Sequence, residues 1–255
     1  QWKKCSRTVK RQQAEQLSTV QLQRKECKMN PNITRVLLKP KEDREINQGF
    51  PWVFDNEIAS VKYNAKDGTG VKTSSLADCD VDDGAVVEVC TNAGGFLGTG
   101  VINRKSKITI RIFSREHANQ IMADTYGYWD KVIRNAVNIR KLNFADSDSY
   151  RLVFGEADFV PGLICERYVD DGKVYLVVQF LALACEIFRK EILSALEKAC
   201  SPYAVYERSD AAVREKEGLL EKAGWIGKIG KEVITIVENG IRIEVDLARG
   251  QKTGY

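Results

Sequence analysis

The sequence is poor in the residues that build metal sites and charge-relay centres. It contains one histidine, His117, and its seven cysteines are scattered, with no two at C-x-x-C spacing. A zinc site needs clustered thiolates or imidazoles, so the sequence predicts no bound metal. A Ser-His-Asp or Cys-His centre would have to use His117, and no G-x-S-x-G nucleophile turn is present. We therefore expect no catalytic residue in this chain.

Long apolar runs are also missing. The longest, Val174 to Cys185, is too short and too interrupted to cross a bilayer, and the first residues lack the apolar core of a signal peptide. An odd number of cysteines fits reduced thiols better than a disulfide framework. These features predict a cytoplasmic protein that does not contact a membrane.

Two glycine-containing segments fall short of known phosphate loops. The run "GQKTG" (250–254) lacks the first glycine of the G-x-x-x-x-G-K-[ST] motif. The run "GGFLGTG" (94–100) lies in a β-rich context, without the strand-then-helix unit of a dinucleotide-binding fingerprint. We interpret the second run as a strand with bends.

Basic charge is concentrated at one end of the chain. The net charge is +4, but residues 1–28 contribute +6 and the remaining residues −2. The basic segment has few apolar residues, so we expect it to be disordered. A nucleic-acid-binding arm and an organelle transit peptide are alternatives. A further interpretation is that Met29 is the initiator and that residues 1–28 are not translated.

The remaining sequence predicts a β-rich part followed by an α/β part. Residues 108, 110 and 112 alternate with polar positions as in a strand, and Trp129, Ile133 and Val137 fall on one helical stripe. Asn239-Gly240 separates two alternating segments, which predicts a hairpin. Ser209 is expected to cap a short helix. The predicted strands are 35–39, 85–90, 95–102, 107–113, 151–155, 162–168, 173–180 and 203–207, and the second long helix is 186–200.

Two clusters of cations favour RNA as a partner. One surrounds the strand at 107–113 and the other precedes the aromatic run "GFPWVF" (49–54). Cations neutralise phosphates, and aromatic rings stack on unpaired bases. The alternative is that the aromatics are core residues and the charges a solvated rim. The predicted RNA-binding residues are Lys39, Lys41, Arg44, Trp52, Arg104, Lys105, Lys107 and Arg111.

Four segments, in order, resemble one enzyme family. They are "QGFPWVF" (48–54), "YRLVFGEADFVPGLICERY" (150–168), "YERSDAAVREKEGL" (206–219) and "GQKTGY" (250–255). Together they are similar to the class I S-adenosylmethionine-dependent methyltransferases of large-subunit ribosomal RNA that begin with a PUA domain. Phe50 stands where many members have histidine.

The resemblance implies an α+β fold: a small PUA-like β-barrel and then a central α/β domain, with the Rossmann-like methyltransferase domain absent. The implied divisions are a basic tail (1–28), the PUA-like domain (29–116), the central domain (117–248) and the start of the cofactor domain (249–255). The family methylates carbon-5 of cytosine through a cysteine thiolate, and none of the seven cysteines here inherits that role. Gln251, Lys252 and Thr253 match a segment near the cofactor.

The resulting expectation is a fragment: the RNA-binding part of a 23S ribosomal RNA cytosine-5 methyltransferase, not catalytic by itself. The full-length family member would use S-adenosylmethionine, and this chain alone would hold no cofactor. Ribosomal RNA is the expected partner, and a homodimer would be compatible with the family. The alternative is a complete stand-alone RNA-binding adaptor.

Overall fold

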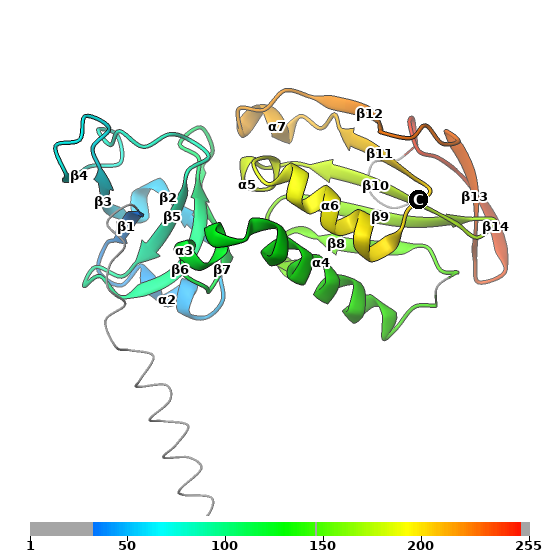
Figure 1. Ribbon diagram of the computed structural model, residues 1–255, viewed down its shortest axis with the longest axis horizontal. Helices are drawn as coiled ribbons and strands as arrows, with labels where there is room; N and C mark the ends of the chain where they lie inside the picture. Colours follow the sequence, from blue (N-terminus) through cyan, green and yellow to red (C-terminus); the bar gives the residue numbers. More distant parts are fainter. Residues whose placement is uncertain (1–32, 146, 251–255) are drawn as a thin grey trace, which may run out of the picture. The chain divides into compact units, whose positions relative to one another are not determined.

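The computed structural model describes residues 33–145 and 147–250, which form two sheets, a separate hairpin and the helices that cover them (Figure 1). The predicted basic tail and the three predicted cofactor residues lie outside the described residues. Among the described residues, no helix is long and apolar enough to cross a membrane.

The first sheet has seven strands in the order β2-β7-β6-β5-β1-β3-β4, and only β1 and β5 run parallel. Four of its strand pairs contain a register shift, which bends the strands. The bounds are β1 Thr34–Leu38, β2 Trp52–Phe54, β3 Ile58–Asn64, β4 Val71–Ser74, β5 Val86–Cys90, β6 Phe96–Ile102 and β7 Ile108–Ser114, with the short helices α2 (Asp43–Asn47) and η1 (Asp55–Glu57) between strands.

Glycines allow β6 to cross β7 closely. A Cβ atom at Gly100 would lie 2.7 Å from the carbonyl oxygen of Arg111, and one at Gly98 would lie 2.8 Å from Ile112 Cγ2. The glycine run 94–100 is therefore a bent strand, as the sequence indicated. Ile110 and Ile112 enter the core of this sheet, which confirms the alternation predicted for β7.

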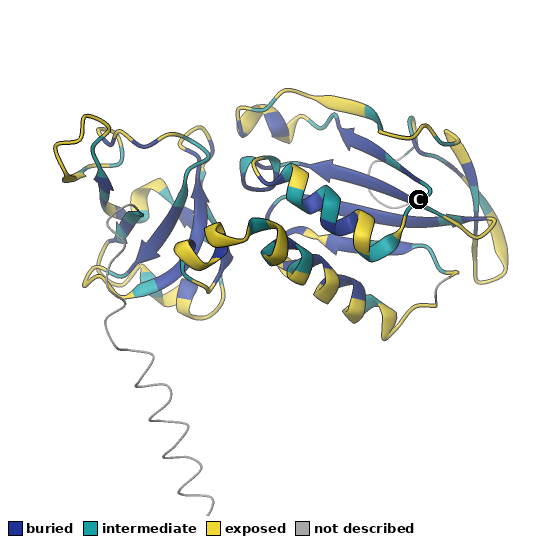
Figure 2. Cartoon of the chain, in the orientation of Figure 1, coloured by how far each residue is buried: buried dark blue, intermediate teal, exposed yellow. Residues whose placement is uncertain are grey.

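The second sheet has five strands in the order β12-β11-β10-β9-β8, with β10 and β11 parallel and all other pairs antiparallel. Helices α4 and α6 cover one face, and their buried stripes point toward the sheet (Figure 2). The bounds are α3 Ala118–Ala123, α4 Thr125–Lys141, β8 Tyr150–Phe154, η2 Gly155–Asp158, β9 Leu163–Asp170, β10 Lys173–Phe180, α5 Leu183–Glu186, α6 Arg189–Cys200, β11 Ala204–Ser209, α7 Val213–Lys216, β12 Lys222–Ile226, β13 Val233–Glu238 and β14 Ile241–Asp246.

Side chains of β10 alternate between two cores. Leu176 and Val178 pack under α4 and α6, whereas Tyr175 and Val177 pack against the β13–β14 hairpin on the other face. A strand buried on both sides has a continuous apolar sequence, as β10 does. Asn239 and Gly240 both have positive φ (50° and 80°), which confirms the predicted tight turn of the hairpin.

The second sheet corrects one part of the predicted fold class. The sequence predicted an α+β fold from which Rossmann-like architecture was absent, but β10, α5, α6 and β11 form a strand–helix–parallel-strand unit inside a mixed sheet. Units of this kind build Rossmann-like sheets. The prediction rested on the resemblance, which placed the methyltransferase domain after residues 249–255, and the parallel pairing of β10 with β11 could not be read from that resemblance.

Local errors were few. Ser209 does not cap a helix: it ends β11, and its hydroxyl accepts a hydrogen bond from the Phe180 backbone N–H, while α7 begins at Val213 after Ala212. The interpretation failed because a buried strand end competed for the same hydroxyl. Strands β2, β3, β4 and β12 were not predicted. Strand β2 is short and β4 and β12 contain no buried residue, whereas β3 has three buried residues and was missed without such a reason.

Candidate RNA-binding surface and the polar network beneath it

The first predicted cation cluster lies where β1 leads into α2. The Lys39 ammonium group donates a hydrogen bond of 2.6 Å to the Asn56 carbonyl oxygen. Lys41 is exposed with φ of 79°, and Arg44 is exposed on α2. Neither of these two side chains has a hydrogen bond or ion pair to any described residue, so both can meet a phosphate.

The second cluster follows β6, and Arg104 in it has an internal role. Its Nε atom lies 3.0 Å from Asp83 Oδ1, and its terminal nitrogens donate to the carbonyl oxygens of Cys79 (3.2 Å) and Val81 (2.7 Å). The Asp83 pair and the neighbouring cysteine raise the pKa of Arg104. Arg104 therefore fixes the acidic loop that precedes β5.

Lys105 and Lys107 are both exposed in the same connection. The Lys105 stem lies over Gly218, where an added Cβ would be 2.5 Å from Lys105 Cδ. Lys107 makes no hydrogen bond or ion pair with a described residue. Lys107 is thus the cation of the second cluster with the fewest contacts to described residues.

Trp52 and Arg111 share one carboxylate. The Trp52 indole N–H and an Arg111 terminal nitrogen each lie 2.8 Å from Glu156 Oε1, and the Arg111 guanidinium lies 5.7 Å from the Trp52 ring centre. Phe50 meets Trp52 edge-on at 5.5 Å. The aromatic run is accordingly half-buried and internally engaged, which agrees with the alternative that these aromatics serve packing.

A second carboxylate, Glu217, completes the network and is almost fully buried. It accepts hydrogen bonds from Ser106 (2.7 Å), Arg111 (3.0 Å), the Asn103 amide (3.0 Å) and the Leu183 backbone N–H (3.2 Å). Burial raises the pKa of the Glu217 carboxyl, but the hydrogen bonds from Ser106 and Arg111 outweigh it, so the pKa lies below its ordinary value. Three of the four resembling segments therefore meet at Arg111, through residues 52, 156 and 217.

The carboxyl ends of the parallel strands β10 and β11 are filled by the chain's own side chains. Arg214 is 1% exposed, and its guanidinium donates to the Phe180 carbonyl oxygen and to Glu186. Ser209 accepts from the Phe180 N–H beside it. Cofactors of open α/β sheets bind in the crevice outside such strand ends. Arg214 therefore occupies the region next to the end of β10 at Phe180.

The predicted cofactor residues Gln251, Lys252 and Thr253 follow directly on a fixed carbonyl. Arg208 donates to the carbonyl oxygens of Leu247 (3.0 Å) and Gly250 (3.2 Å). The three residues themselves lie outside the described part of the chain, so their contact with a cofactor stays a prediction.

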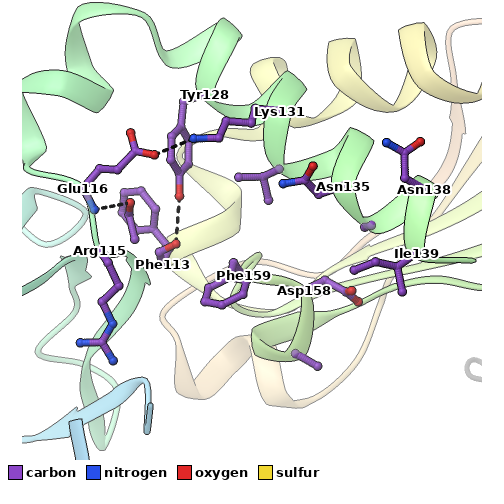
Figure 3. Close-up of a pocket in the computed structure, with 14 residues that line it drawn as sticks. Phe113, Arg115, Glu116, Tyr128, Lys131, Asn135, Asn138, Ile139, Asp158 and Phe159 are labelled. Carbon is purple, nitrogen blue, oxygen red and sulfur yellow. Dashed lines mark hydrogen bonds and ion pairs between the residues drawn. The ribbon is translucent and has the colours of Figure 1, made fainter. Parts of the chain in front are cut away.

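A pocket of about 470 Å³ lies between α4, the end of β7 and the η2 turn (Figure 3). Its walls include Phe113, Tyr128 and Phe159, and Asn135 and Asn138 of α4 lie along one side. The Tyr128 hydroxyl donates to the Phe113 carbonyl oxygen at 2.9 Å, which ties α4 to β7. Burial raises the pKa of Tyr128 to about 12, so its hydroxyl stays protonated.

Three buried cysteines are poor nucleophiles. Burial raises the pKa of Cys90 to about 11 and that of Cys185 to about 12, and it raises the pKa of Cys165 well above its usual value. The thiolate is the reactive form, so these side chains are unreactive at neutral pH. No group of three or more potential metal ligands occurs among residues 33–145 and 147–250.

Sequence reasoning missed Glu156, Glu217 and Phe159. The first two lie inside segments that were singled out for resemblance, but nothing in the spacing tells that a carboxylate will meet an arginine more than 40 positions away. The sequence did contain a sign that Phe159 is exposed. This apolar residue stands between a turn and a Val-Pro-Gly sequence, where burial is not required.

Residues 36–115 match a family described as a PUA-like domain. This match identifies a PUA-like domain in the first part of the chain. The matched residues cover the seven-stranded sheet, so Lys39, Lys41, Arg44 and Lys107 lie in the PUA-like domain. His117, which begins α3 just after it, is paired with the buried Glu88 at 2.9 Å and stacks on Phe96 at 4.0 Å.

Curated relatives resemble most of this chain. The protein is 31% identical over 226 residues to "Ribosomal RNA large subunit methyltransferase I" of Tolumonas auensis and 33% identical over 224 residues to the protein of the same name in Shewanella frigidimarina. Each alignment covers 87% of this chain and 51% of the relative. The chain spans about half the length of the curated relatives it matches.

Solved structures give the same picture of the fold. A protein from Streptococcus mutans, described as a SAM-dependent methyltransferase, aligns with a TM-score of 0.60 at 18% identity, over 85% of this chain and 49% of its own. A second, described as a methyltransferase complexed with SAH, aligns at 0.61 and 17%, with the same two coverages.

These matches complete the correction of the predicted fold class. The prediction held that the Rossmann-like methyltransferase domain is absent, yet methyltransferase structures cover 85% of the chain, including the mixed sheet of its C-terminal region. This chain shares its fold with about half of each of the two solved structures described as methyltransferases. The description of the chain as a fragment, inactive and without cofactor, is not retained.

Proposed function

We propose that the protein acts in the methylation of large-subunit ribosomal RNA, with S-adenosylmethionine as the methyl donor. The observation that carries this proposal is the 31–33% identity to two proteins named as large-subunit ribosomal RNA methyltransferases, over 87% of this chain. The PUA-like match and the two structural neighbours described as methyltransferases support it.

The described residues supply RNA binding in this proposal. Lys41, Arg44 and Lys107 are exposed and have no ion partner among the described residues, so they meet the phosphate backbone. Lys39 and Lys105 add charge beside them. Trp52, Arg104 and Arg111 act indirectly, because their polar groups hold the sheet, the acidic loop and the Glu156–Glu217 network in place.

Several finer predictions remain part of the proposal. The reaction is methylation of carbon-5 of a cytosine, the RNA-binding unit is residues 29–116, and residues 117–248 form the unit that follows. The segment at 249–255, with Gln251, Lys252 and Thr253, approaches the cofactor. A cytoplasmic location and a homodimer are compatible with these assignments.

Disruption of the gene tests the proposed reaction. Large-subunit ribosomal RNA from the disrupted strain should lose a methyl group at one nucleotide, and digestion followed by mass spectrometry would detect the loss. If the missing nucleoside is 5-methylcytidine, the carbon-5 assignment holds. Loss of another methylated nucleoside rejects only that assignment, and an unchanged methylation pattern rejects the reaction.

RNA binding is tested separately with the purified 255-residue chain. Fluorescence anisotropy with unmodified large-subunit ribosomal RNA segments should show saturable binding that weakens as salt increases. Absence of binding at low salt would contradict the role given to the PUA-like domain.

A further inference from the structure

The pocket between α4 and η2 contains an aromatic ring in an unusual backbone conformation. Phe159 has φ of 60° and ψ of 27°, in the left-handed region, and is 60% exposed. A bulky residue in this region is strained, by roughly 1–3 kcal/mol, and here little burial offsets that strain. Strained residues cluster at binding sites, so the conformation of Phe159 points to a ligand.

The turn that presents Phe159 is held rigidly. Arg140 of α4 binds both carboxylate oxygens of Asp158, at 2.5 and 2.6 Å, and Asp158 also accepts the Phe154 N–H at 2.7 Å. The Phe159 N–H donates to the Glu156 carbonyl oxygen at 3.1 Å. The backbone that carries the ring is therefore held in place before any ligand arrives, which lowers the entropic cost of binding.

Polar groups of α4 stand beside the ring. Asn135 and Asn138 are exposed and line the pocket, and neither amide has a hydrogen-bond partner among the residues the structure describes. Figure 3 shows both amides along α4, on the side of the pocket away from Arg115. An amide offers both donors and an acceptor, the combination that reads the edge of a nucleobase.

The rim of the pocket includes one guanidinium group, that of Arg115. The Arg115 guanidinium donates to two carbonyl oxygens, of Leu97 (2.5 Å) and Ile46 (2.6 Å), and forms no ion pair with a carboxylate among the described residues. Lys131 and Glu116 form an exposed pair at 2.8 Å, which cancels in charge. The guanidinium of Arg115 therefore offers one positive charge that an anionic group of a ligand could approach.

We propose that this pocket binds an unpaired base of RNA, which stacks on Phe159 and is read by Asn135 and Asn138, with the adjoining phosphate near Arg115. The inference rests on the proposed function, since it supplies a recognition site for the same RNA. Single-stranded RNA is recognised by stacking of splayed bases on aromatic rings together with hydrogen bonds to their edges. Through Glu156 in the same turn, the pocket is joined to Trp52 of the PUA-like domain.

The test uses a short single-stranded RNA that carries one 2-aminopurine, with the full 255-residue chain. Stacking on Phe159 should quench the fluorescence of the probe. Phe159→Asn removes the ring and suits the left-handed conformation, so it should fold, abolish the quenching and weaken binding of this RNA about tenfold. Phe154→Asn is the matched control: Phe154 is 53% exposed five residues earlier and outside the pocket, so its removal should change neither quenching nor affinity.

A second pair of variants tests the reading of the base. Asn135→Leu and Asn138→Leu should keep the stacking but reduce discrimination among RNAs that differ in one base. Competition by a short peptide or a free nucleoside equal to that by RNA would overturn the choice of ligand.

The possible failures are distinguishable. If the wild-type chain binds RNA by anisotropy while Phe159→Asn leaves quenching and affinity unchanged, the pocket proposal is rejected and the proposed function stands. If the wild-type chain binds no RNA, the pocket proposal and the RNA-binding role of the PUA-like domain are both rejected, while the methylation pattern of the disrupted strain still decides the reaction.

Discussion

Arg111 Nη2 lies 3.0 Å from Glu217 Oε1, although the two residues are 106 positions apart in the chain. The arginine belongs to β7 of the first sheet, and the glutamate follows α7 beside the second. Since Glu156 binds the other terminal nitrogen of Arg111, two distant segments meet on one guanidinium. A residue predicted to bind RNA therefore serves to join the PUA-like domain to the residues that follow it.

Loss of the Glu217 carboxylate should destabilise the protein strongly. Glu217→Ala leaves the Arg111 guanidinium, 13% exposed, without one of its partners, and such losses cost about 3 kcal/mol. Urea denaturation would measure the change in the free energy of unfolding. Lys131→Ala is the control, because its exposed pair with Glu116 should contribute less than about 1 kcal/mol. Equal effects of the two substitutions would show that the network adds no stability.

Stability should fall in acid, in part through Glu217. Its pKa is lower in the folded chain than in the unfolded one, so its stabilising effect is complete above the unfolded pKa of about 4.3 and is lost as pH falls through the folded pKa. Glu217→Gln cannot titrate there. The slope of unfolding free energy against pH below about pH 4.5 should therefore be smaller in Glu217→Gln, and identical slopes would contradict the pKa assignment.

Charge reversal at Arg44 or Lys107 should weaken RNA binding without harming the fold, because neither side chain has a described intramolecular partner. The slope of log affinity against log salt should become shallower by about 0.7–0.9 for each phosphate that the variant no longer neutralises. Lys190→Glu on α6 gives the same change in net charge at an exposed position of the other sheet's helix layer. Anisotropy titrations at several salt concentrations compare the three variants. If all three bind RNA equally well, Arg44 and Lys107 do not belong to the RNA-binding surface.

Phe159→Asn should increase the free energy of unfolding by up to about 1 kcal/mol. Asparagine tolerates the left-handed region better than phenylalanine, and the exposed ring loses little burial. Urea denaturation of Phe159→Asn and Phe154→Asn would show a gain only in the first. A stability loss at residue 159 would mean that ring packing, rather than ligand binding, maintains the strain.

Alkylation should spare the buried cysteines. With a pKa of about 12, Cys185 has almost no thiolate at pH 8, and Cys165 is equally buried. Iodoacetamide treatment followed by peptide mass spectrometry should leave both unmodified in the folded chain and label them in urea. Rapid labelling of either in the native protein would identify a reactive thiol that the structure does not explain.

Much of the fold could be predicted from local patterns. The strand at 173–180 matches β10 residue for residue, since its apolar run is continuous, and Asn239-Gly240 marked the hairpin. The short strands β2 and β4 were not predicted because three or four residues show too little periodicity. The parallel pairing of β10 with β11 escaped as well, because pairing partners are a property of the whole fold.

The candidate site was harder to predict for a physical reason. Positive charge in the sequence does not reveal whether a side chain meets solvent or a distant carboxylate. Lys107 and Arg111 looked equivalent as cations, yet one is exposed and the other is held by Glu156 and Glu217. The pocket was invisible for the same reason, since Asn135 and Phe159 approach each other only through the docking of α4 on η2.

The hydrophobic cluster around Trp129 includes Val101 and Phe113, which come from the first sheet. Phe113 stacks on Trp129 at 5.5 Å, so two residues of the first sheet contribute to the core of the second across the expected boundary near residue 116. A shortened protein that contains the PUA-like domain alone would expose these two residues to solvent, and we expect it to aggregate. A shorter version that stays soluble must carry α4 and the sheet beneath it.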